Sequence, residues 1–115
     1  MNQTKIVPAI SDITDEAKSL FGDALERVVV FGSYARGDFT DGESDLDIAL
    51  FLQCDPPEII AKRNALIDAT INIDYKHDIV TSYRIIPVGQ WTKHKENSNL
   101  YANILNEGVS YYERT

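Results

Sequence analysis

Apolar residues in the first part of the chain recur with the period of an α-helix. They form one stripe that begins near Ser11, a possible N-cap, and acidic residues lie near the same end, where the helix dipole favours them. The stripe contains Ile10, Ile13, Ala17, Leu20, Phe21, Ala24 and Leu25. This pattern predicts a helix that packs on a core without chemistry of its own. The preceding segment, 1–9, shows little periodicity and contains a proline, so we expect a loose lead-in.

Two later stretches have the composition and alternation of β-strands. Val28–Phe31 is β-branched and aromatic, as in a buried strand, and Asp45–Leu52 alternates with period two. The alternation places Asp45, Asp47 and Ala49 on one face, and Leu46, Ile48 and Leu50 on the other. Two carboxylates are therefore predicted to share one face of a strand.

A glycine-flanked turn connects these two strands. Gly32 and Ser33 end the first strand, and Ser33–Arg36 can form one helical turn whose free N–H groups point back toward Gly32. Such a helix end can bind an anion, because its unpaired donors and its dipole act together. Two carboxylates beside an anion-binding turn indicate a site for a metal ion and a phosphate.

The second half of the chain predicts a helix followed by a third strand. Asp55, Pro56 and Pro57 end the second strand and start a helix that continues to about Ile71. Tyr75–Ser82 is predicted as a strand, with Asp78 on one face and His77 on the other.

The C-terminal part is less regular. The polar segment Pro87–Asn99 predicts a loop that can contain a short helix around Gln90–His94. Asn99–Glu107 has helical spacing and ends at Gly108, and Val109–Tyr112 is either a short closing strand or a docking tail. Trp91 is interpreted as a packing residue.

The turn and the paired carboxylates carry a family resemblance. Gly32-Ser33, then eleven residues, then Asp45-Leu46-Asp47, with Ala35-Arg36-Gly37 in between, resembles the nucleotidyltransferase signature of the DNA polymerase β superfamily. Over nearly its whole length the chain is similar to the small, single-domain minimal nucleotidyltransferases (MNT). The resemblance implies an α/β (α+β) nucleotidyltransferase fold: a small twisted mixed β-sheet with helices on one face and the carboxylates on the other.

The resemblance also implies roles for individual residues. Gly32 and Ser33 would contact the triphosphate of a nucleotide, while Asp45 and Asp47 would hold Mg²⁺ ions, two in all, with Mn²⁺ as a possible substitute. Arg36 either reaches a phosphate or is a solvated surface charge.

A third metal ligand is expected on a neighbouring strand, because two acids supply too few oxygen ligands for two ions. In the family this carboxylate lies in an apolar strand after the intervening helix, and Asp78, followed by Ile79 and Val80, matches that position. Asp74 is the alternative, although it lies where a helix end or a turn is expected. His77 should point away from the carboxylates. The cluster Lys93-His94-Lys95 is interpreted as surface charge, with a phosphate contact as the alternative.

Composition and charge limit the function classes. With 115 residues the chain is predicted to form a single domain, 1–115, and its formal net charge of −7 argues against direct nucleic-acid binding. The single cysteine, Cys54, excludes an internal disulfide and suits the cytoplasm, and we find no signal peptide and no apolar run of membrane-spanning length.

Together these features predict an enzyme that transfers AMP from ATP to a hydroxyl group, with Asp45, Asp47 and Asp78 as catalytic and metal-binding residues. The MNT resemblance further implies an antitoxin whose helical HEPN-type toxin partner is modified on a tyrosine. Two alternatives stay open: a non-catalytic nucleotide-binding module that acts by complex formation, and a stand-alone enzyme with a small-molecule acceptor.

Overall fold

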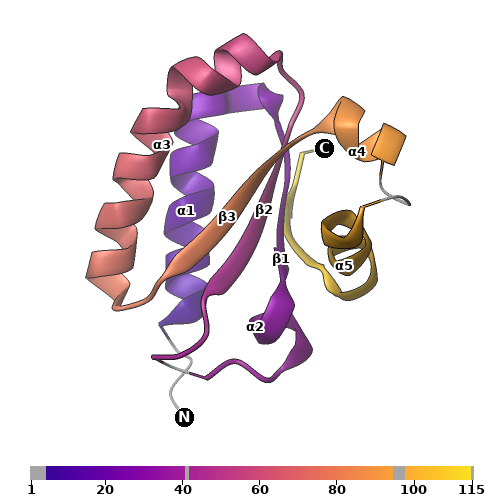
Figure 1. Cartoon of the computed structure of the whole chain (residues 1–115). Helices are drawn as coiled ribbons and strands as arrows, with labels where there is room; N and C mark the ends of the chain where they lie inside the picture. Colours follow the sequence, from indigo (N-terminus) through magenta and orange to yellow (C-terminus); the bar gives the residue numbers. More distant parts are fainter. Residues whose placement is uncertain (1–4, 41, 95–97, 115) are drawn as a thin grey trace.

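The computed structural model of the chain describes residues 5–40, 42–94 and 98–114. Its centre is a four-stranded mixed sheet in the order β3-β2-β1-β4, with β1 Leu25–Phe31, β2 Leu46–Leu52, β3 Thr81–Pro87 and β4 Val109–Glu113. The strand β1 is antiparallel to β2 and β4, whereas β2 and β3 are parallel (Figure 1). The predicted fold class, a small mixed sheet with helices, is confirmed.

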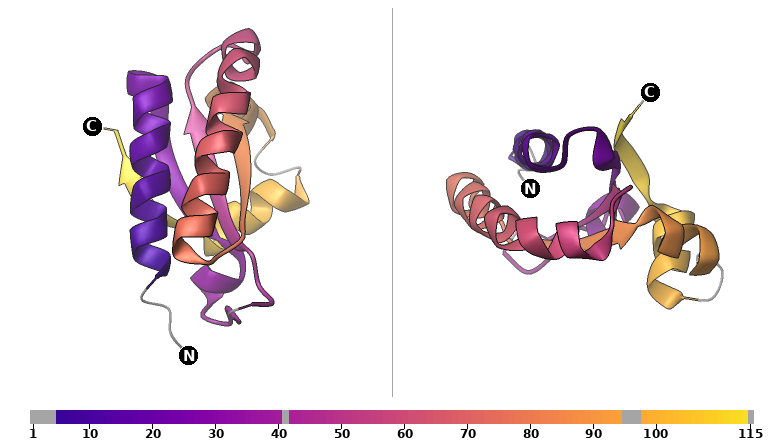
Figure 2. Two further views of the ribbon diagram at one scale, coloured as in Figure 1. Left: turned by 90° about the vertical axis from the view of Figure 1, so that its left-hand side faces the viewer. Right: turned by 90° about the horizontal axis from the view of Figure 1, so that it is seen from above.

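Two long helices, α1 Ile6–Phe21 and α3 Pro56–His77, pack side by side on one face of the sheet (Figure 2). The short 3₁₀-helix η1, Gly22–Ala24, connects α1 to β1. The core on this face contains Ile10, Ile13, Ala17, Leu25, Val28, Val30, Leu46, Ile48, Leu50 and Leu66. The stripe predicted for the first helix packs on the core, but α1 begins at Ile6, inside the segment that we expected to be a loose lead-in. Ala24 and Leu25, which we counted in the helical stripe, lie in η1 and β1 instead.

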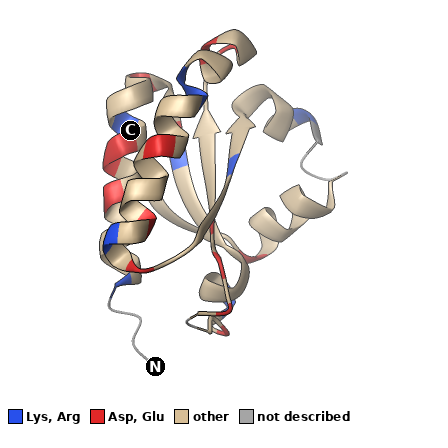
Figure 3. Cartoon of the chain, turned by 60° about the vertical axis from the view of Figure 1, so that its left-hand side comes forward, with Lys and Arg blue, Asp and Glu red and all other residues tan. Residues whose placement is uncertain are grey.

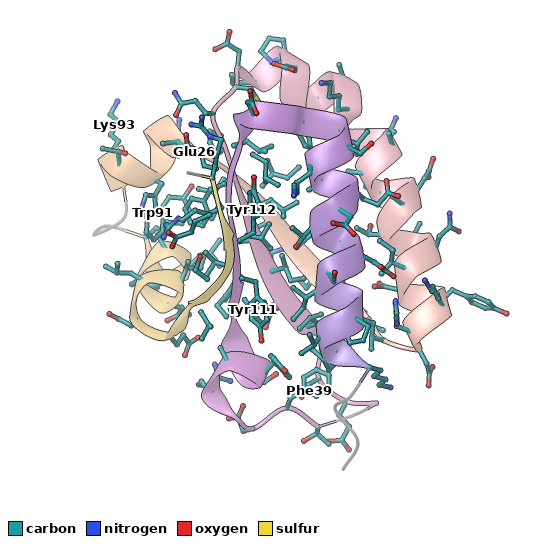
Figure 4. All side chains as sticks on the ribbon, turned by 180° about the vertical axis from the view of Figure 1, so that it is seen from behind. Glu26, Phe39, Trp91, Lys93, Tyr111 and Tyr112 are labelled. Carbon is teal, nitrogen blue, oxygen red and sulfur yellow. The ribbon has the colours of Figure 1, made fainter. Side chains whose placement is uncertain are left out.

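Two short helices cover part of the opposite face of the sheet. Trp91 of α4, Val88–His94, packs edge to face on Phe51 of β2 with 4.9 Å between ring centroids, and it also contacts Tyr101 of α5, Asn99–Glu107. Figure 4 shows Trp91 between these two helices and Lys93 pointing away from them. The packing interpretation of Trp91 is confirmed, and the acidic residues at the start of β2 lie outside this small apolar core.

The third strand begins later than predicted. The prediction of a strand over Tyr75–Ser82 was wrong at both ends, because α3 continues to His77 and β3 starts at Thr81 and ends at Pro87. Asp78 ends the helix in the left-handed conformation, with φ 54°. Tertiary contacts explain the longer helix, since His77 Nε2 lies 2.7 Å from the Asp12 carboxylate of α1.

Asp74 fixes the connection between α3 and β3. Its carboxylate accepts hydrogen bonds from the Thr81 backbone N–H at 2.9 Å and from the Thr81 hydroxyl at 2.6 Å. The expectation that Asp74 is a helix-end residue is confirmed. Among the described residues, none of the helices is long and apolar enough to span a membrane.

Candidate active site

The turn between β1 and β2 brings a glycine against a carboxylate. Phe31, the last residue of β1, pairs with Asp47 of β2, and Gly32 follows as the first residue of α2, Gly32–Arg36. Gly32 has φ 72°, and a Cβ at this position would overlap Asp47 Oδ2 and lie 2.9 Å from Asp47 Cγ. Only glycine provides both the backbone angle and the space that this contact requires.

The strand β2 presents its carboxylates on the face opposite α1 and α3. Leu46, Ile48 and Leu50 point into the core beneath those helices, whereas Ala49 and Phe51 belong to the core beneath α4 and α5. Asp47 shares the face of Ala49 and Phe51 because strand side chains alternate, and Asp45 lies directly before the strand. The predicted separation of acidic and apolar faces is confirmed.

The environment of Asp47 disfavours its negative charge. Partial burial raises the pKa of the Asp47 carboxyl above its ordinary value, and the nearby Asp45 carboxylate raises it further. Arg84 and Arg36 oppose this rise, while Glu107 adds to it. A cation bound between the two carboxylates would relieve their mutual repulsion and stabilise the ionised form of Asp47.

Arg36 is held by acidic side chains. Its Nη1 donates to both carboxylate oxygens of Glu107, at 3.2 and 3.3 Å, and its Nε donates to Asp38 at 3.4 Å. Ser33, three residues earlier, has a hydroxyl with no hydrogen-bond partner among the described residues. Ser33 and Arg36 are the two predicted phosphate ligands with a polar side chain. The Ser33 hydroxyl is therefore available for a ligand, whereas the Arg36 guanidinium is already bound to two carboxylates.

We did not predict Glu107 as part of the site. It is the last residue of α5 and reaches α2 from the other end of the chain. A negative charge at a helix C-terminus is opposed by the helix dipole, so such a residue signals a contact outside its own helix. The partner could not be identified in this way, because Arg36 and Glu107 are separated by 71 positions along the chain.

The structure does not place Asp78 beside Asp47 in the sheet. The Asp78 side chain is fully exposed after the end of α3, and its carboxylate lies 3.8 Å from Lys5 Nζ. Asp78 and Asp45 both border a depression of about 250 Å³, which lies between the segments that precede β2 and β3. In the part of the chain that the structure describes, no three His, Cys, Asp or Glu side chains are grouped as metal ligands.

The positions beside Asp47 on β3 belong to other residues. In the parallel register Asp47 pairs with Ser82, and Ala49 pairs with Arg84. Two residues that pair directly across adjacent strands point to the same face of the sheet. Ser82 and Arg84 therefore lie on the face of the carboxylates. The strand prediction that ended at Ser82 left Arg84 outside it.

Two other predicted residues have structural contacts. His77 points away from the carboxylates of β2, as expected. Its ring contacts the Asp12 carboxylate of α1 instead. Tyr34 of α2 packs edge to face on Phe39 with 6.1 Å between ring centroids. Lys93 is exposed at the end of α4, whereas Lys95 and the side chain of His94 lie outside the described residues.

The comparison with known families identifies the class of protein to which this chain belongs. The family model of the nucleotidyltransferase domain matches residues 10–111. The chain belongs to this family. The predicted family and the predicted enzyme class, a nucleotidyltransferase, are confirmed.

Proteins of Methanocaldococcus jannaschii are similar to this chain in sequence. "Putative protein adenylyltransferase MJ0604" is 30% identical over 112 residues, which cover 97% of this chain and 100% of the relative. "Putative protein adenylyltransferase MJ0141" is 32% identical over 78 residues, covering 68% of this chain and 76% of the relative. A crystal structure described as a toxin–antitoxin with AMP-PNP has a TM-score of 0.51 and 18% identity, covers 100% of this chain and 76% of its own, and so shares the fold.

Proposed function

We propose that the protein is an adenylyltransferase that moves AMP from Mg²⁺-bound ATP to a hydroxyl group of a partner protein. The observation that carries this proposal is the contact of Gly32 with Asp47, which joins the Gly32-Ser33 turn to the acidic end of β2. A nucleotide at this position would have its phosphates beside the turn and its metal ion on Asp45 and Asp47.

The carboxylates fit a divalent cation. Asp45 and Asp47 offer oxygen ligands, which Mg²⁺ prefers, and partial burial together with the Asp45 charge raises the pKa of the Asp47 carboxyl, so a bound cation would favour its ionised form. Bound there, Mg²⁺ or Mn²⁺ would neutralise the phosphate and position it for attack. The free Ser33 hydroxyl donates to a phosphate oxygen, and Arg36 can do so when it exchanges one of its acidic partners for the nucleotide.

The reaction replaces one bond at phosphorus with another. The acceptor oxygen forms a bond to the α-phosphorus, the bond from this phosphorus to the bridging oxygen breaks, and pyrophosphate leaves with the bonding electron pair. The hydroxyl proton passes to water. The chain's own groups bind the phosphates and hold them in line, while the acceptor is supplied by the partner.

We infer that the acceptor is a tyrosine of a helical HEPN-type toxin and that the protein acts as its antitoxin in the cytoplasm. The inference is supported by relatives that are named as protein adenylyltransferases and by the shared fold with a toxin–antitoxin structure that contains AMP-PNP. Each added AMP brings a negative phosphate, which would repel RNA from a nucleic-acid-binding surface of the toxin.

The test is co-expression of the chain with the protein encoded by the neighbouring gene, followed by intact mass measurement of that neighbour. We expect a mass increase by whole AMP units with the wild type and none with Asp45→Asn. An unmodified neighbour that is bound and inhibited would overturn the transfer reaction. A neighbour that neither binds nor changes in mass would favour a small-molecule acceptor.

One observation favours a second function, a nucleotide-binding module that neutralises its partner without catalysis. Among the described residues no third acid is grouped with Asp45 and Asp47 as a metal ligand, and fewer ligands reduce the capacity for two-metal chemistry. The two functions differ in the same experiment, since only the enzyme changes the mass of the partner.

A further inference from the structure

Arg84 is a basic residue on the face of the sheet that carries the acidic pair. It lies on β3, where it pairs with Ala49, two residues beyond Asp47 and on the same face. Asp47 pairs with Ser82, so no acid of β3 stands beside the carboxylates. Where coordination chemistry leads us to expect a further carboxylate on the neighbouring strand, this chain has a hydroxyl and a guanidinium.

Arg84 lies two residues beyond Ser82, the strand partner of Asp47, and on the same face of the sheet. Its positive charge lowers the pKa of Asp47, against the rise caused by burial and by Asp45. Arg36 has the same effect, but its guanidinium is bound to Glu107 and Asp38. Unlike Arg36, Arg84 forms no ion pair with an acidic side chain among the described residues.

The guanidinium of Arg84 is available for a ligand. Among the described residues its hydrogen bond is a long one of 3.4 Å from Nη1 to the backbone carbonyl oxygen of Tyr83, and no carboxylate lies within ion-pair distance. The side chain is exposed, and β3 is the edge strand of the sheet, so no further strand limits its movement. Figure 3 shows a basic position on this edge strand, above the acidic loop that leads into β2.

The rest of the carboxylate face fits a phosphate on Arg84. Ala49 and Phe51 follow the acidic pair along β2 and belong to the small core beneath α4 and α5. On the β3 side of the site, by contrast, the residues are the polar Ser82 and Arg84. A polyphosphate that begins at the Gly32-Ser33 turn and passes over Asp47 would reach this side. A guanidinium donates two parallel hydrogen bonds to phosphate oxygens and stays charged at every physiological pH.

We propose that Arg84 binds a phosphate group of the nucleotide, and that the site therefore holds one divalent cation, on Asp45 and Asp47, with the guanidinium as its second positive charge. The proposal rests on the proposed function, because it requires that the site binds a nucleotide. It departs from the two-ion arrangement that we expected from the sequence.

The first test compares nucleotide affinity by calorimetry in the presence of Mg²⁺. We expect Arg84→Ala to weaken the binding of AMP-PNP by about 10- to 100-fold, the range for a lost charge-assisted hydrogen bond, and Arg84→Lys to restore part of it. Adenosine, which has no phosphate, should lose no affinity. Arg63→Ala is the matched control, because Arg63 is an exposed arginine of α3 that lies near Arg84 along the same edge groove but on the helix side.

The outcomes separate the inference from the function on which it rests. Equal affinities of wild type and Arg84→Ala for AMP-PNP would overturn the role of Arg84 and leave nucleotide binding intact. A wild-type chain that binds no AMP-PNP would overturn both. An equal loss in Arg63→Ala would also overturn the proposal, since it would show a general effect of net charge.

The second test counts metal ions with Mn²⁺ in place of Mg²⁺. Electron paramagnetic resonance of the wild type with AMP-PNP should show an isolated Mn²⁺ ion. Two ions in one site would lie about 3.5–4 Å apart and give a spin-coupled spectrum, which would overturn the one-ion arrangement.

Discussion

Gly32 and Asp47 are in direct contact, and the space beside the Asp47 carboxylate exists only because residue 32 has no side chain. Phe31, which precedes this glycine, pairs with Asp47 across the two strands. The Gly32-Ser33 turn and the carboxylate are therefore one structural unit, and a change in either should affect both.

Gly32→Ala tests this contact. We expect a loss of about 2 kcal/mol or more in the free energy of unfolding, since the left-handed backbone and the overlap with Asp47 both oppose a Cβ, together with a loss of nucleotide binding. The measurement is urea unfolding combined with calorimetry. Gly22→Ala is the control, because Gly22 also has a positive φ, 56°, but a Cβ there meets nothing within 4 Å. If both variants lost nucleotide binding equally, the contact would not be responsible.

Asp47→Asn tests the electrostatic cost of the acidic pair. Because the folded chain raises the pKa of Asp47, its ionised form is less favourable in the folded than in the unfolded state. The resulting loss of stability is complete above the raised pKa and absent below the ordinary value of 3.8. Without divalent cations, Asp47→Asn should therefore melt at a higher temperature than the wild type at pH 7, and the difference should vanish on acidification below that value.

The same variant tests the cation. Mg²⁺ binding to the folded state should raise the melting temperature of the wild type by mass action and leave that of Asp47→Asn unchanged. Asp68→Asn, an exposed acid of α3, should respond like the wild type. A wild type without any Mg²⁺-dependent shift would contradict a metal site at Asp45 and Asp47.

Asp78→Ala addresses the acid that the sequence favoured as third ligand. Its side chain is fully exposed beyond the end of α3, so we expect AMP transfer to stay within about threefold of the wild type. Asp45→Asn should reduce transfer by more than about 100-fold, since even partners of metal ligands are worth about 10- to 100-fold. Equal losses in kinetic assays of the two variants would restore Asp78 to the site.

Asp74→Ala tests the junction of α3 and β3. Two hydrogen bonds to Thr81 would be lost, so we expect a decrease of about 2 kcal/mol in the free energy of unfolding, measured by chemical denaturation. Asp74→Asn keeps an acceptor oxygen and should lose less. An unchanged stability of Asp74→Ala would show that the start of β3 is fixed by the neighbouring strand alone.

Local patterns predicted the parts of the fold that short stretches determine. The alternation of Asp45–Leu52 identified the faces of β2 correctly, and the glycine at position 32 identified the turn, because each depends on neighbours in the sequence. The end of α3 could not be found in this way. Tyr75-Lys76-His77 is compatible with a helix or a strand, and the contact of His77 with Asp12 on α1 decides for the helix.

The site shows the same division between local and distant information. Gly32, Asp45 and Asp47 lie within one strand–turn–strand unit, whereas Arg84 and Glu107 reach it from β3 and α5. Finding those two residues requires the parallel register of β2 and β3 and the position of the last helix. A single sequence contains neither directly.

The pairing of β4 with β1 has a consequence for the synthesis of the chain. β1 is an early strand, yet β4, which covers one of its edges, is the last element, and Glu107 lies just before it. While the chain leaves the ribosome, that edge of β1 has no partner and can pair with other chains. The emergence of β4 both protects the edge and brings Glu107 to Arg36, so the contact between α5 and the turn of α2 forms only as the sheet closes.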